Sequence, residues 1–181
     1  VVWILTVVVW VVLLVVLLPL KLGFVGWDCC GLSAEDAQRG WVLCNTVLCS
    51  LFTWQNALTL PWRAACGVHL LPCGRCADPG LDFYGRPTES MFFHIPTGHR
   101  ACITALLNLS VCLQFMQQAC RSVYTTYEAS EVEQPGQALI LGSFIGGIVC
   151  ALAGGVWQFS QLYTLHRLYP ERFPPSAAVT A

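Results

Sequence analysis

Residues 1–20, VVWILTVVVWVVLLVVLLPL, contain no charged side chain. A helix rises 1.5 Å per residue, so a helix of this length matches the roughly 30 Å hydrocarbon core of a bilayer. The stretch lacks the basic leader and small-residue cleavage site of a signal peptide, and Val1 is not an initiator Met. We therefore expect a retained membrane span with further residues upstream of it.

The composition of the whole chain agrees with a membrane protein. Hydrophobic residues make up 56% of the 181 residues and charged residues 10%, against roughly 45–50% and roughly 25% in soluble domains. The net charge is −1, and no run of Lys and Arg indicates a surface for nucleic acid or anionic lipid. We therefore expect membrane lipids and other membrane subunits as partners, and no nucleic acid.

Three further apolar stretches are long enough to cross a bilayer, at about residues 41–60, 101–123 and 138–162. Ser33 and Asp36 resemble a capping box before the first of these, and Pro61 is predicted to end it. The predicted fold is all-α, with a single polytopic membrane domain over residues 1–165. It has four transmembrane helices, a long loop at 62–99 between helices two and three, and a short tail at 166–181.

The loop at 62–99 is the largest segment outside the predicted spans. We expect packing on partners or on the membrane to order it, with Phe92, Phe93 and Ile95 of an amphipathic piece facing lipid. Most basic residues near span ends lie in this loop and in the tail. The positive-inside rule therefore predicts that both termini and this loop lie on the cytoplasmic, matrix or stromal side of the membrane. An organelle membrane is one of the locations that this prediction allows. The segment Glu128–Glu133 lies on the opposite side in this topology.

Small residues recur at three- and four-residue spacing along the last predicted span. Small side chains let helix backbones approach each other closely in a bilayer, so this pattern predicts close helix packing. The partner helix, in this chain or in another, is left open. The predicted packing residues are Gly142, Gly146, Gly147, Ala151, Gly154 and Gly155.

Amide side chains form a second pattern inside the predicted spans. Gln114, Gln117, Gln118 and Arg121 share one stripe of a helix, and amides facing lipid are costly. We expect interhelical hydrogen bonds, with a solute pathway as the alternative. No Asp, Glu, Lys, Arg or His lies near the centre of a predicted span, which argues against a pump or coupled transporter. The intramembrane polar residues singled out are Asn45, Asn108, Gln114, Gln117 and Gln118.

Cysteine and histidine side chains supply the candidate ligands of a metal or cofactor. The set Cys66, His69, Cys73 and Cys76 has the ligand types and compact spacing of a structural zinc site. Incidental thiols are the default interpretation because the chain has 11 cysteines, and a Cys73–Cys76 redox pair is another alternative. His94 and His99, near predicted helix ends, are candidate pigment or haem ligands. The cofactor stays open between pigments and lipids, with zinc disfavoured.

A set of short motifs resembles a multi-pass membrane family of fungi and plants, known as a domain of unknown function. In plants this family resembles the membrane part of proteins that also carry a placenta-specific-8-like domain. The resemblance covers most of residues 27–165, implies a multi-helix membrane module, and brings no catalytic residues. The cluster from Cys66 to Cys76 departs from the family pattern. The motifs are Ser33–Asp36, Trp41, Asn45, Leu51–Thr53, Pro61–Arg63, Leu106–Asn108, Gln114, Tyr127–Glu128, Gln134–Pro135 and Gly154–Trp157.

These observations predict a non-catalytic accessory subunit of a larger membrane complex. The sequence lacks the motifs GxSxG, Walker A, HExxH and the Rossmann fingerprint, so we expect no enzyme activity. An organellar energy-converting complex, photosynthetic or respiratory, is a host that the sequence permits. The alternatives are a self-associating channel or small-solute conduit, and a zinc- or thiol-responsive membrane regulator.

Overall fold

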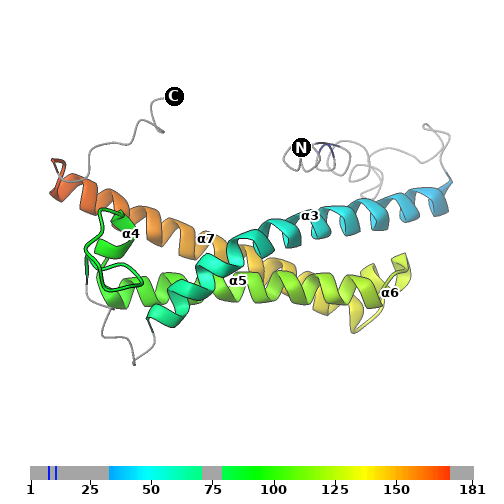
Figure 1. Cartoon of the computed structure of the whole chain (residues 1–181). Coiled ribbons are helices and arrows are strands. Elements are labelled where there is room, and N and C mark those ends of the chain that lie inside the picture. Colours follow the sequence, from blue (N-terminus) through cyan, green and yellow to red (C-terminus); the bar gives the residue numbers. More distant parts are fainter. Residues whose placement is uncertain (1–7, 9–10, 12–32, 71–78, 172–181) are drawn as a thin grey trace. The chain divides into compact units, whose positions relative to one another are not determined.

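The structure, a computed structural model, describes Val8, Val11 and residues 33–70 and 79–171 (Figure 1). Within these residues every named element is a helix, which confirms the all-α prediction for this part of the chain. The predicted span at 1–20 lies outside the described residues apart from Val8 and Val11, and so do Cys73 and Cys76. The helices are α3 (Ala34–His69), α4 (Met91–His94), α5 (Thr97–Val123), α6 (Tyr127–Glu131) and α7 (Gly136–Leu168).

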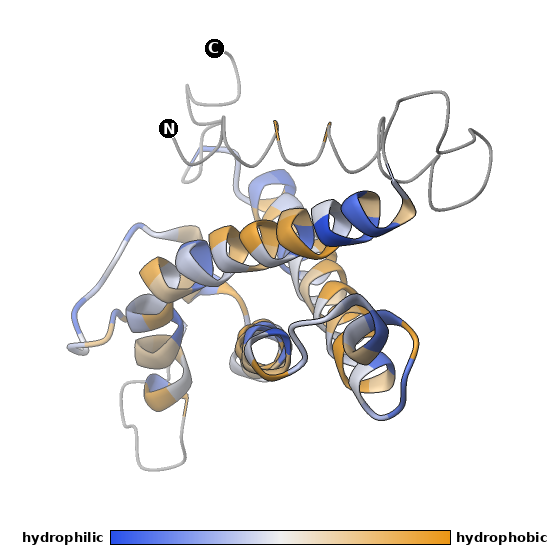
Figure 2. Cartoon of the chain, turned by 90° about the vertical axis from the view of Figure 1, so that its right-hand side faces the viewer, coloured by the Kyte–Doolittle hydropathy of each residue, from blue (hydrophilic) through white to orange (hydrophobic). Residues whose placement is uncertain are grey.

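Two of the described helices, α5 and α7, are long and apolar enough to cross a membrane. They contain 27 and 33 residues and coincide with the third and fourth predicted spans. Helix α5 begins before the predicted start at residue 101, and α7 extends beyond both ends of the predicted span at 138–162. Helix α3 is longer, at 36 residues, and it is not one of the two. Figure 2 shows hydrophilic residues in blue at the start of α3 and hydrophobic residues in orange farther along.

Helix α3 begins where the sequence predicts and ends later than predicted. The backbone N–H of Asp36 donates to the Ser33 hydroxyl at 3.1 Å, and that hydroxyl donates to the Asp36 carboxylate at 2.6 Å. The prediction that Pro61 ends the helix is wrong, because α3 continues through Pro61 to His69. Contacts beyond the proline outweigh its missing N–H: Arg63 donates to the Leu107 carbonyl at 3.1 Å, and the Cys66 side chain is buried.

The chain divides into two compact units, and α3, α5 and α7 each contribute to both. The first unit comprises residues 1–58 and 112–146, and the second comprises residues 59–111 and 147–181. Buried described residues of the first unit are Ala37, Leu48, Cys49, Gln117, Arg121, Ser130, Gly136, Ile140 and Ser143. Those of the second unit are Cys66, His69, Phe93, Ile95, Arg100, Ile103, Thr104, Ser110, Val111 and Gly154.

The second part of the predicted loop, residues 79–95, packs on its own unit. Phe93 is 3% exposed and Ile95 is fully buried, so the prediction that both face lipid is wrong. Phe93 makes edge-to-face contacts with Phe83 and Trp62, at centroid distances of 5.0 and 6.2 Å. Other aromatic rings of the chain cover the apolar side chain of Phe93, so it does not need lipid as its cover.

Candidate functional site

The amide of Gln114 makes the main described polar contact between α3 and α5 in the first unit. Its Nε2 donates to the Cys49 carbonyl and to the Thr53 hydroxyl, both at 3.3 Å. The Cys49 sulfur lies 3.4 Å from the same nitrogen. Thr53 also donates to the Cys49 carbonyl, at 2.8 Å, so these three residues form one network. A hydrogen-bonded network of this kind fixes the register of two helices in an apolar environment.

The other singled-out amides also have partners inside the chain or are buried. Gln118 donates to the Ser50 hydroxyl at 3.2 Å, and Asn45 donates to the Trp41 carbonyl one turn earlier in α3. Asn108, in the second unit, lies 3.4 Å from the Arg63 carbonyl oxygen. Gln117 is buried. The amides that would line a conduit therefore all donate to acceptors within the protein. They are Asn45, Asn108, Gln114 and Gln118.

The small residues of α7 divide into two groups. Gly146 and Gly154 face α5: a Cβ on Gly146 would lie 3.2 Å from Leu113, and one on Gly154 would lie 3.0 Å from Leu107. Gly147 is half-buried, whereas Gly142, Ala151 and Gly155 are exposed. A Cβ on Gly142 or Gly155 would meet nothing within 4 Å. Part of the small-residue pattern thus serves contacts inside the chain, and part lies on an open surface.

Cys66 and His69 lie one turn apart at the end of α3, beside an aromatic cluster of the second unit. His69 contacts Phe83 and Phe93 edge to face, at centroid distances of 5.5 and 6.0 Å. Burial raises the pKa of the Cys66 thiol to about 11, although the nearby Arg100 charge opposes this shift. Zinc binds the thiolate, so zinc binding at Cys66 would release the thiol proton.

The remaining ligand candidates are placed singly. His94 Nδ1 lies 3.2 Å from the Ser90 carbonyl oxygen, and His99 contacts Trp157 edge to face at 5.8 Å. Among residues 33–70 and 79–171, His, Cys, Asp and Glu form no group of three that could hold a metal ion. The zinc hypothesis involves Cys73 and Cys76, which the structure does not describe, so it stays a prediction.

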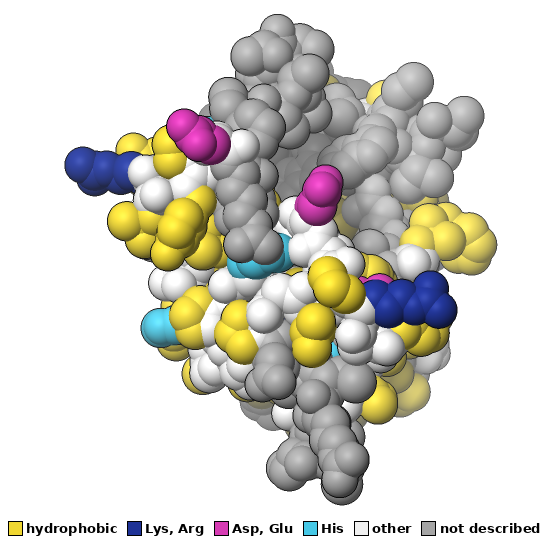
Figure 3. All heavy atoms as spheres, turned by 60° about the vertical axis from the view of Figure 1, so that its left-hand side comes forward, with side chains coloured by type: hydrophobic (Ala, Val, Ile, Leu, Met, Phe, Trp, Pro, Cys, Tyr) yellow, Lys and Arg dark blue, Asp and Glu magenta, His cyan; other side chains and the backbone are white. Residues whose placement is uncertain are grey.

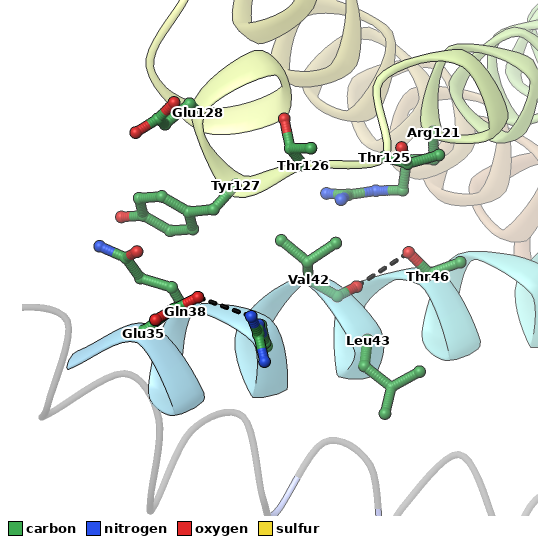
Figure 4. A pocket seen from close by; sticks show the side chains of 11 residues that line it. Glu35, Gln38, Val42, Leu43, Thr46, Arg121, Thr125, Thr126, Tyr127 and Glu128 are labelled. Atoms are coloured by element: carbon green, nitrogen blue, oxygen red, sulfur yellow. Dashed lines mark hydrogen bonds and ion pairs between the residues drawn. The ribbon is translucent and has the colours of Figure 1, made fainter. Parts of the chain in front are cut away.

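A pocket of about 730 Å³ lies in the first unit, between the first turns of α3 and the segment that joins α5 to α6 (Figure 4). Arg121, in the last turn of α5, enters this pocket with a side chain that is 7% exposed. The Glu131 carboxylate lies 3.6 Å from Arg121 Nη2. The described residues that line the pocket are Glu35, Gln38, Arg39, Val42, Leu43, Thr46, Arg121, Thr125, Thr126, Tyr127 and Glu128.

Sequence reasoning missed the burial of Arg100, which it treated as a basic residue near a span end that indicates orientation, whereas Arg100 is fully buried. Arg121 was counted among those basic residues too, but it was also placed on the stripe of Gln114, and it is nearly fully buried. Arg100 donates to the Thr97 hydroxyl at 3.2 Å. The spacing of Arg121 seven residues after Gln114 was the available signal, since it places both on the stripe that faces α3.

Comparison with known proteins identifies no relative: no protein family, no curated protein and no solved structure matches this chain.

Proposed function

We propose that the protein is a non-catalytic structural subunit of a larger membrane assembly. The observation that carries this proposal is the uncovered apolar surface of α7. Only 17% of the most apolar window of this helix is buried, and its mean hydropathy is 2.2. A large apolar surface of this kind requires lipid or another apolar protein surface as its cover.

The exposed side of α7 supports contacts with a neighbouring helix as well as with lipid. Large apolar residues recur along it at helical spacing, and they include Phe159, which is 72% exposed. The open glycines Gly142 and Gly155 would let another backbone approach beside this stripe. Figure 3 shows one face of the molecule, where hydrophobic side chains are spread over the surface and charged ones are few. The stripe comprises Leu141, Ile145, Ile148, Leu152, Val156, Phe159 and Tyr163.

The hydrogen bonding of the amides favours a structural role over the conduit alternative. A conduit needs polar groups that face a water-filled path and that can exchange hydrogen bonds with the passing solute. The amide donors of Gln114 and Gln118 are occupied by Cys49, Thr53 and Ser50. These donors are thereby matched inside the chain without a solute, while the buried Oε1 of Gln118 accepts no hydrogen bond from the described residues.

The proposed subunit has four spans, at 1–20, 41–60, 101–123 and 138–162 in the predicted numbering, with both termini on the cytoplasmic, matrix or stromal side. Helices α5 and α7 supply two of these spans, and the middle of α3 and residues 1–20 supply the others. Membership in the fungal and plant family of unknown function is part of the same proposal. An organellar energy-converting complex is the host we would examine first.

The test is gentle extraction of the native protein in a mild detergent, followed by sizing, absorbance spectroscopy and identification of co-purifying chains. We expect a particle much larger than 19.9 kDa plus its detergent, with stoichiometric partner chains. A photosynthetic host would add pigment absorbance to the same peak. A monodisperse particle that contains this chain alone would contradict the proposal, and flux measurements in liposomes would then test the conduit.

A further inference from the structure

The pocket of the first unit holds a buried arginine whose donors are only partly matched. Glu131 contacts Nη2 of Arg121 at 3.6 Å, which is long for a charge-assisted hydrogen bond. The buried atoms Nε and Nη1 have no hydrogen-bond partner within the described chain. These two atoms carry three of the five N–H donors of the guanidinium.

Buried donors of this kind are costly unless an acceptor reaches them. Leaving the N–H groups of a charged side chain unmatched forfeits the interactions they make with water. Figure 4 shows the Arg121 side chain between Val42 of α3 and the Thr125–Tyr127 segment, on the pocket side of α5. An acceptor that enters the pocket can therefore meet the unmatched donors.

The rest of the lining favours an anion with several oxygen atoms. Thr125, Thr126 and Gln38 bring hydroxyl and amide groups, and the Thr126 oxygen accepts from the Ala129 N–H at 3.2 Å, which leaves its hydroxyl proton free to donate. Of the acids, Glu35 is already paired with Arg39 at 2.6 Å. In Figure 4 the Glu128 side chain is drawn above the Tyr127 ring on the left of the view, and the Arg121 side chain is on the right. Phosphate is one of the anions whose oxygen atoms match the planar fork of the Arg guanidinium.

We propose that this pocket binds a phosphate group, with Arg121 as its buried anchor, and that a phospholipid headgroup is the source. Arg121 lies in the last turn of α5, where a membrane-spanning helix would meet the headgroup layer. Val42 and Leu43 line the same pocket, and Leu43 is 65% exposed, so an acyl chain has an apolar path beside the phosphate. The volume of about 730 Å³ is sufficient for a headgroup.

The experiment measures ligand binding to the purified full chain in non-ionic detergent by native mass spectrometry. The probes are phosphatidylglycerol, diacylglycerol with the same acyl chains, and inorganic phosphate. We expect phosphatidylglycerol to bind and diacylglycerol to bind far more weakly. Arg121→Gln should weaken phosphatidylglycerol binding about ten- to hundredfold, because it removes charge-assisted hydrogen bonds. The matched control Arg86→Gln removes an exposed arginine from the second unit and should leave binding unchanged.

The outcomes separate the two sources of phosphate and the structural alternative. Competition by inorganic phosphate would support a site for the lipid phosphate, whereas binding of inorganic phosphate without binding of phosphatidylglycerol would overturn the lipid source and assign the site to a soluble phosphate compound. Equal binding of phosphatidylglycerol and diacylglycerol, or binding by Arg121→Gln within twofold of the unsubstituted chain, would overturn the proposal.

A variant that does not depend on loss of Arg121 keeps the test valid if Arg121→Gln fails to fold. Glu131→Gln removes the carboxylate that competes for the guanidinium, so it should preserve or strengthen phosphatidylglycerol binding. If Arg121 served only as the structural partner of Glu131, Glu131→Gln would lower the unfolding temperature, and phosphatidylglycerol would not restore it. That second result would refute the phosphate site.

Discussion

At the scale of single residues, Gln114 ties α5 to α3 in the first unit through the Cys49 carbonyl and the Thr53 hydroxyl. Gln114→Leu should lower the free energy of unfolding, because it removes both bonds. A double-mutant cycle with Thr53→Val should give a coupling energy of about 0.6 kcal/mol, with ~1.7 kcal/mol as the upper end for such bonds in membrane proteins. The measurement is reversible unfolding in mixed micelles. Thr164→Val, in the second unit, is the control and should show no coupling with Gln114→Leu; the same coupling for both pairs would contradict the role of Thr53.

Gly136 and Gly142 make a second residue-scale comparison within α7. A Cβ on Gly136 would overlap the carbonyl oxygen of Ala129 and lie 3.1 Å from the Tyr124 ring. A backbone oxygen cannot rotate away, so Gly136→Ala should destabilise the protein by about 2 kcal/mol. The matched substitution Gly142→Ala meets nothing within 4 Å and should be neutral or stabilising, because Ala favours a helix. Thermal unfolding compares the two, and equal unfolding temperatures would count against this account of Gly136.

Individual residues show which contacts the sequence pattern could predict and which it could not. The helical spacing of Gln114 and Gln118 indicated a common face, and the structure supplies the acceptors on α3. The complete burial of Arg100 has no such local pattern behind it, so the sequence indicated only a basic residue near a span end. The pocket around Arg121 joins residues from 35–46 with residues from 121–128, a pairing that no periodicity encodes.

At the scale of elements, the long apolar helices were predictable and their ends were not. The composition of residues 101–123 and 138–162 alone requires helices of bilayer length, and α5 and α7 occupy them. Pro61 is a strong local signal for a helix end, yet α3 passes through it because later residues pack in the second unit. The amphipathic piece predicted around Phe93 forms the helix α4, but protein rather than lipid covers its apolar side, because Phe93 is buried.

The contact of the end of α3 with residues 79–95 depends on the protonation of His69. Burial lowers the pKa of His69 from its usual 6.5, and the Arg100 charge adds to this shift while Asp82 opposes it. The folded state therefore favours the neutral ring. The stabilisation is complete above pH of about 6.5 and is lost as the pH falls toward the lowered pKa of the folded state. We expect the unfolding temperature to decrease between pH 7.5 and 5.5.

His69→Gln should flatten this pH dependence, because its side chain does not titrate, whereas His166→Gln should leave it in place. Asp82 does not interfere in this range. Its pKa is lowered by hydrogen bonds from the Arg86 and Tyr84 backbone N–H groups and by nearby positive charge, so its contribution is lost only below pH of about 3.8. Thermal unfolding of the full chain at three pH values is the measurement. An equally steep dependence in His69→Gln would assign the effect to another group.

At the scale of the whole molecule, the number of spans determines which segments share a side of the membrane. Four spans place residues 21–32 and the Glu128–Glu133 segment on one side, and residues 79–90 and the C-terminal tail on the other. A protease-cleavable tag inserted at each position, in vesicles of known orientation, should be cut in these two groups. If the tag in residues 21–32 is cut together with the tag in residues 79–90, the predicted span at 41–60 does not cross, because it is the predicted span that separates these two positions. That result would agree with the finding that α3 is not one of the two described helices long and apolar enough to cross a membrane.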